Sequence, residues 1–133
     1  MVHSMLAVLA GFVVMALLVM MTTALAVRFV LHLPVSSMRT PGPGMPSPAY
    51  LATNVAASGI AALVGGYTTA AIAAHDQIAH GLGLAAVMVV MSVVSMRQSG
   101  SAQPRWYRVV LATVMPALAV SGAALGGAGA GTP

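Results

Sequence analysis

The chain contains no cysteine and, among its 133 residues, one acidic residue, Asp76. The absence of thiols excludes disulfides, thiolate metal sites and a cysteine nucleophile. A single carboxylate also excludes catalysis by a paired acid and base. The sequence shows no other nucleophile motif, no glycine-rich phosphate loop leading into a suitable helix and no four-ligand metal set. We therefore expect no enzyme activity, no metal ion and no cofactor of the chain's own.

Charged side chains of any kind are scarce. They make up 5% of the chain and hydrophobic residues 59%, against about 25% and 45–50% in soluble domains. Four apolar runs, at 5–27, 51–74, 78–96 and 109–125, are each long enough to cross a hydrocarbon core about 30 Å thick. With their flanking signals they predict spans at about 4–33, 50–74, 78–96 and 105–125. We expect an all-α polytopic transmembrane protein with a single domain, 1–133.

The positive charge comes entirely from five arginines, and these follow only two of the spans. Arg28 and Arg39 follow or end the first span, and the other three flank the loop between the third and fourth. Those two loops emerge on the same side, which the positive-inside rule makes cytoplasmic. The basic excess is then a signal for topology and for anionic lipid, and no nucleic-acid partner is expected. The prediction is a multi-pass protein of the bacterial inner membrane with both termini outside.

Two connecting segments add to this arrangement. The segment 34–48 holds five of the eight prolines and predicts an extended cytoplasmic loop, because no regular helix survives that density of proline. It serves as a spacer for the first helix, as a segment lying along a partner, or as a solvated linker. The turn 74–77 is very short and predicts that the second and third spans form an antiparallel hairpin. No basic leader precedes the first span, so we interpret it as a retained helix and not as a signal peptide.

The second span carries the clearest internal pattern, a row of small residues four apart. Residues four apart share one face of a helix, and small side chains allow helices in lipid to approach closely. The row therefore predicts a helix-packing interface, either within the chain, with a partner subunit, or beside a flat cofactor. An adjacent row, which includes Gly65, is small throughout as well. The predicted interface consists of Ser58, Ala62, Gly66, Ala70 and Ala74.

Aromatic and basic residues alternate at the start of the fourth span. Arg105, Trp106, Tyr107 and Arg108, together with Arg28 at the end of the first span, predict anchors at the membrane interface, with rings at head-group level and guanidinium groups on phosphates.

His80 is the one candidate cofactor ligand. It lies four residues after Asp76, so that the two can hydrogen-bond across one helical turn as a local cap. Alternatively, the imidazole is an axial ligand to a haem iron or a chlorophyll magnesium, with Gly81 and Gly83 leaving room for the macrocycle. No ionisable residue falls near the middle of a span, which disfavours coupled ion transport.

Three short motifs carry a resemblance. Gly-Gly-Tyr at 65–67, His-Gly-Leu at 80–82 and Pro-Arg-Trp-Tyr at 104–107 resemble a loose group of small four-helix bacterial membrane proteins of unassigned function. The resemblance covers roughly 48–127 and implies a topology. In size and composition the chain is also similar to small accessory subunits of photosynthetic or respiratory complexes.

Together these patterns predict a non-catalytic accessory subunit of a larger bacterial membrane complex, most plausibly an electron-transfer or photosynthetic one. Its expected partners are larger membrane-embedded subunits and lipids, with chlorophyll-type pigment or lipid at a subunit interface. The alternative is a homo-oligomeric small channel or transporter. A membrane enzyme would need its catalytic groups from a partner.

Overall fold

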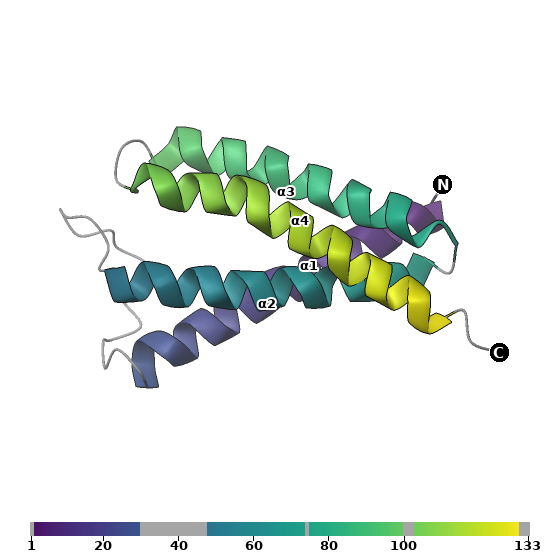
Figure 1. Cartoon of the computed structure of the whole chain (residues 1–133), viewed down its shortest axis with the longest axis horizontal. Coiled ribbons are helices and arrows are strands. Elements are labelled where there is room, and N and C mark those ends of the chain that lie inside the picture. The colour runs from purple at the N-terminus through teal and green to yellow at the C-terminus, as the bar shows by residue number, and fades with distance from the viewer. Residues whose placement is uncertain (1, 30–47, 74, 100–102, 131–133) are drawn as a thin grey trace.

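The computed structural model describes residues 2–29, 48–73, 75–99 and 103–130, and these form four helices (Figure 1). The helices are α1 (Val2–Phe29), α2 (Pro48–Ala73), α3 (Gln77–Ser99) and α4 (Arg105–Ala130). Each contains a stretch long and apolar enough to cross a membrane. The predicted all-helical architecture with four such helices is therefore confirmed. The proline-rich loop, with Arg39, lies outside the described residues.

The helix ends follow local signals. Pro48 begins α2, where its fixed φ suits a helix and its missing N–H needs no partner. Asp76 precedes α3 in a left-handed conformation, with φ of 49°, and its carbonyl accepts the His80 N–H at 3.1 Å. The fourth helix runs to Ala130, beyond the predicted end at 125. Packing explains this extension, because Gly126 lies against the Tyr67 carbonyl of α2, where an added Cβ would come within 3.1 Å.

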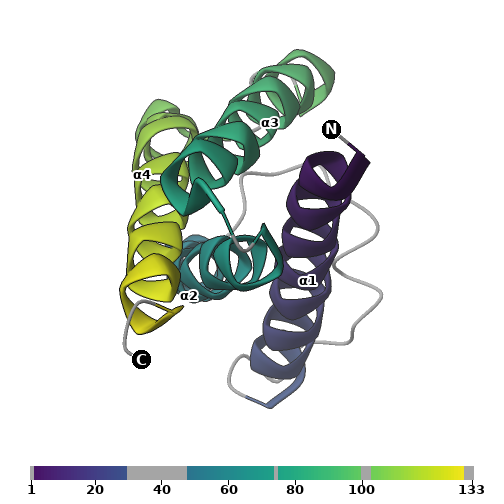
Figure 2. The same ribbon diagram turned by 90° about the vertical axis from the view of Figure 1, so that its right-hand side faces the viewer.

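The bundle is built around α2. It packs against α1 on one side and α4 on the other, while α3 packs chiefly on α4 and less on α2 (Figures 1 and 2). The sequence predicts α2 and α3 as a hairpin, but the main neighbour of α3 is α4, the helix that follows it. Contact between α1 and α3 is slight. In the order α1, α2, α4, α3, each helix therefore packs against the next. The bundle is open between the first and last of this series, α1 and α3.

Two consecutive glycines let α2 approach both neighbours closely. A Cβ on Gly66 would collide with the Ala119 carbonyl oxygen of α4, and one on Gly122 would collide with that of Leu63. A Cβ on Gly65 would lie 2.9 Å from the Met15 Cβ and 3.0 Å from the Gly11 oxygen, both on α1. Successive residues point about 100° apart around a helix, so each glycine serves a different neighbour.

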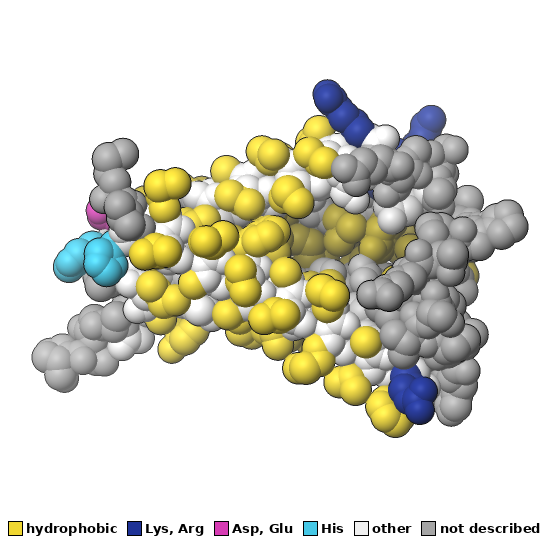
Figure 3. Space-filling view, turned by 180° about the vertical axis from the view of Figure 1, so that it is seen from behind, with side chains coloured by type: hydrophobic (Ala, Val, Ile, Leu, Met, Phe, Trp, Pro, Cys, Tyr) yellow, Lys and Arg dark blue, Asp and Glu magenta, His cyan; other side chains and the backbone are white. Residues whose placement is uncertain are grey.

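The outer surface is apolar along its length and charged at its ends. Large side chains such as Met5, Leu9, Leu17 and Met20 of α1 are exposed, as expected of a surface that faces lipid. Figure 3 shows arginines at one end of the molecule and Asp76 with histidines at the other. The described arginines thus share one end, as the loop argument requires.

Candidate functional site

The small-residue row predicted as an interface lies largely inside the molecule. Ala62, Gly66 and Ala70 are buried, and Gly66 meets the backbone of α4. Ser58 is half-buried at the edge of a cleft, and Ala74 lies outside the described residues. Of the three uses the pattern allowed, packing within the chain is the one that the geometry shows for the three buried residues. Their own chain covers them, so they present no face to a partner or a flat cofactor.

The open side of the bundle forms a cleft between α1 and α3, which we call the α1–α3 cleft. Its volume is about 300 Å³, and it appears as a hollow between two ridges of side chains (Figure 3). The cleft exists because α1 packs mainly against α2, whereas α3 packs mainly against α4. Methionines dominate its walls, and their flexible thioether chains adapt to irregular neighbours. They are Met15, Met88, Met91, Met96 and Met115.

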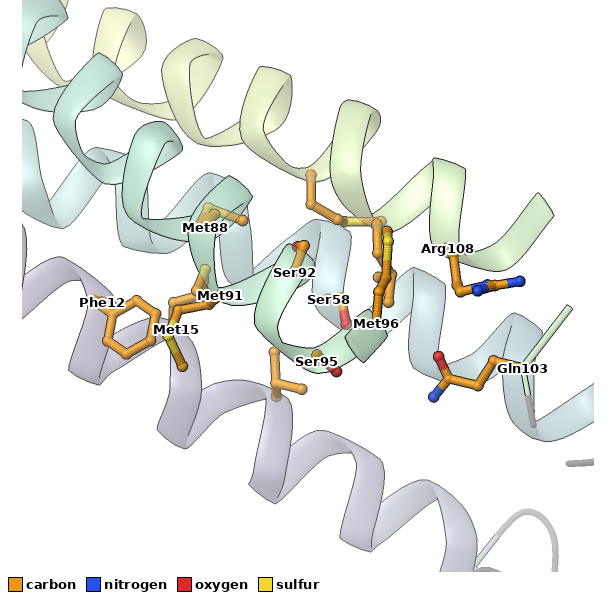
Figure 4. Close-up of a pocket in the computed structure, with 13 residues that line it drawn as sticks. Phe12, Met15, Ser58, Met88, Met91, Ser92, Ser95, Met96, Gln103 and Arg108 are labelled. Carbon is orange, nitrogen blue, oxygen red and sulfur yellow. The ribbon is translucent and has the colours of Figure 1, made fainter. Parts of the chain in front are cut away.

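The cleft is polar at one end. Gln103 and Arg108 lie at that end, Phe12 lies at the other, and Ser92 and Ser95 lie between them (Figure 4). The Arg108 Nε is buried and has no hydrogen-bond partner among the described residues. A buried donor without an acceptor costs free energy, so an acceptor at this position would be stabilising.

A second hollow, of about 870 Å³, continues the cleft towards the other end of the molecule. It shares Phe12 and Met91 with the first, and its far end is lined by Asp76 and His80. The α1–α3 side therefore carries two adjoining, mainly apolar hollows that meet at Phe12 and Met91, one with Arg108 and the other with His80 at its far end.

A hydrogen-bonded chain of three side chains links three helices near the arginine end. The Tyr107 hydroxyl of α4 donates to the Asn54 Oδ1 of α2 at 2.6 Å, and the Asn54 Nδ2 donates to the Thr23 Oγ1 of α1 at 3.2 Å. Thr23 and Tyr107 are both buried. Asn54 lies within the predicted second span, and no pattern in the sequence indicates its partners.

The predicted interface anchors divide into two groups. Arg28, Arg105 and Trp106 are exposed, with Trp106 retaining 51% of its accessible surface. Tyr107 retains 5% and faces the interior of the bundle, so its role as a head-group anchor stays a prediction. Arg108 is half-buried and lines the cleft. Four successive helical residues cannot all face one way, and the helix rotation turns these two inward.

His80 makes the local link that its spacing to Asp76 suggested. Its Nδ1 lies 3.0 Å from the Asp76 carbonyl oxygen, so the ring N–H donates to the backbone and not to the carboxylate. The space expected beside Gly81 is taken by α4, because an added Cβ would lie 2.5 Å from the Ala123 Cβ. No cluster of three or more His, Cys, Asp or Glu occurs among the described residues. Axial ligation of a macrocycle by His80 stays a prediction, without the clearance that Gly81 was expected to provide.

These features define an all-helical protein with four potential membrane spans, a closed α2–α4 contact and an open amphipathic groove. Comparison of the chain with protein-family models, curated proteins and solved structures finds no match. The resemblance to small four-helix bacterial membrane proteins therefore stays a prediction.

Proposed function

We propose that the protein is a non-catalytic accessory subunit that packs beside larger subunits of a bacterial membrane complex. The observation that carries this proposal is a row of small, exposed residues along the outward face of α4. Spacings of four, four, three and four place them on one side of the helix. The row, which we call the α4 outer row, consists of Thr113, Ala117, Ser121, Ala124 and Ala128.

The α4 outer row differs from the other outward surfaces of the bundle. The exposed face of α1 carries large side chains such as Leu9 and Leu17, which make good contact with lipid tails. Small side chains allow another helix to approach closely, and close packing holds helices together in lipid. The Thr113 and Ser121 hydroxyls donate to carbonyls of their own helix at 2.7 and 3.0 Å, so the row needs no polar partner. The row is a strip of small side chains beside the larger exposed Val109 and Leu125, and such a strip suits a second transmembrane helix.

The proposal includes an orientation. The four helices cross the bacterial inner membrane with the arginine end cytoplasmic and both termini outside, and α2 and α3 enter and leave as a hairpin. The support is that Arg28, Arg97, Arg105 and Arg108 share one end of the bundle. A reporter fused to the C-terminus is expected to read as periplasmic, and a cytoplasmic reading would overturn the orientation. That the complex is electron-transferring or photosynthetic rests on similarity of size and composition.

The accessory role is tested by purification in mild detergent. The wild-type chain is expected to co-purify with larger membrane subunits. Ala117→Phe, which puts bulk on the α4 outer row, should abolish that association, whereas Val13→Phe on the exposed face of α1 should preserve it. Both variants should keep the helical circular dichroism of the wild type, because both positions are exposed. A stable self-oligomer with no other subunit would instead favour a homo-oligomeric channel or transporter.

A further inference from the structure

We infer that the α1–α3 cleft binds one anionic phospholipid, with an acyl chain along the groove and the phosphate on Arg108. This inference is independent of the accessory role, because it concerns a ligand of the isolated chain.

The groove has the shape and polarity of a lipid. Its walls are apolar over most of their length, with Phe12, Met88 and Met91 among them, and the second hollow extends this surface towards the opposite end. Within the α1–α3 cleft, the one basic side chain, Arg108, lies at one end together with Gln103 (Figure 4). An acyl chain buries apolar surface along such a groove while its head group meets the polar end.

Arg108 carries the basic group at this end of the cleft. Its Nε is buried and has no acceptor among the described residues, and Asp76, the one acid of the chain, lies at the opposite end of the bundle. A phosphate diester supplies an acceptor and a negative charge, and guanidinium–phosphate hydrogen bonds are strong and directional. Arg108 also lies in the first turn of α4, at the end of a span, which is where a head group sits.

The charge around the cleft selects an anionic lipid over a zwitterionic one. Arg97 and Arg105 are exposed at the same end, and basic residues at a span end attract anionic head groups. A choline head group carries its own ammonium and would face these guanidinium groups with like charge. Ser92 and Ser95, between Arg108 and Phe12, offer hydroxyls to the ester oxygens that follow the phosphate.

Native mass spectrometry of the full-length protein in detergent tests the head-group contact. Phosphatidylglycerol and phosphatidylcholine with identical acyl chains are titrated in parallel, and one bound lipid is expected, with phosphatidylglycerol preferred. Both lipids carry the phosphate diester that Arg108 would bind, so Arg108→Gln should lower the affinity for each about tenfold, the factor given by one charge-assisted hydrogen bond. Arg105→Gln, an equal loss of charge from an exposed arginine of the same turn, should reduce only the preference for phosphatidylglycerol. Equal losses of affinity in both variants would mean diffuse electrostatic attraction and would overturn the site.

A second pair of variants tests the acyl-chain groove and does not depend on Arg108. Ser95→Trp places a large side chain in the cleft, whereas Val94→Trp places it on the exposed face of the same helix. The first should reduce retention of both lipids at least about tenfold, and the second should change neither. Retention of phosphatidylglycerol by Ser95→Trp, or no retained lipid in the wild type, would overturn the inference. Because the isolated chain is used, failure here would leave the accessory role standing, and the reverse also holds.

Discussion

The two sides of this bundle are both built from apolar sequence but pack in opposite ways. On the α2–α4 side, Gly66 and Gly122 allow backbone to touch backbone. On the α1–α3 side, Phe12 and Met91 stand between the helices, and the contact is slight. Hydrophobicity does not separate the two sides, because lipid is as apolar as either. Side-chain size at the contact does, since helices in lipid associate where their backbones can approach.

The largest expected effect comes from breaking the closed side. Gly66→Leu forces α2 away from α4, because even a Cβ would collide with the Ala119 carbonyl oxygen. We expect a loss of unfolding free energy of about 3 kcal/mol or more, at the upper end for overpacking a dense contact. Denaturant titration in detergent micelles, followed by circular dichroism, measures it. Val64→Leu, at an exposed position of the same helix, is the control, and equal stability of the two variants would refute the close α2–α4 contact.

A smaller change on α3 compares its two faces directly. At Gly81 an added Cβ would lie 2.5 Å from the Ala123 Cβ, whereas at Gly83 it would meet the Val8 Cγ2 at 3.4 Å, an ordinary contact. Gly81→Ala should therefore cost about 1–3 kcal/mol by overpacking. Gly83→Ala should gain about 0.5–1 kcal/mol, because alanine favours a helix over glycine. The same unfolding titration gives both values, and a gain at both positions would mean that α3 is loosely packed on both faces.

The hydrogen-bonded chain near the arginine end contributes less than the glycine contacts. Tyr107→Phe removes the donor to the Asn54 Oδ1 and should lower the unfolding free energy by about 1 kcal/mol, within the range for interhelical hydrogen bonds in membranes. Trp106→Phe, which changes the exposed neighbour, is the control and should have a smaller effect. If Tyr107→Phe were as stable as the control, the hydroxyl would not be holding α4 to α2.

The smallest effect is expected at the far end of the open side. His80 is partly exposed and bonds only to the Asp76 carbonyl of its own turn, so His80→Ala should change stability by no more than about 0.5 kcal/mol. The absorption spectrum of the purified protein should also be unchanged. Loss of a discrete haem or chlorophyll band in the variant would instead make His80 an axial ligand and would place a macrocycle, not a lipid, in that part of the groove.

Much of the fold could be predicted because its signals are local. Run length and hydropathy place four helices, and Pro48 and Pro104 lie where two of them begin. The arginines follow only alternate helices, and those among the described residues therefore lie at one end of an up-and-down bundle, whichever helices pack together. Spacing likewise marked the small rows of α2 as packing surfaces. These conclusions need only the geometry of one helix or the parity of the spans.

Only the tertiary structure decided which helix meets which face. The pattern of α2 could not show that the row with Gly66 packs against α4 and the row with Gly65 against α1. It also could not show that α3 packs mainly against α4, which leaves the α1–α3 cleft open. Nor could it show that Tyr107 turns inward to Asn54 and Arg108 into the cleft, while Trp106 remains outside. A helical repeat gives the angle between side chains, but their surroundings depend on contacts between distant segments. Because lipid does not distinguish one apolar helix face from another, steric fit between the helices would determine those contacts in a membrane.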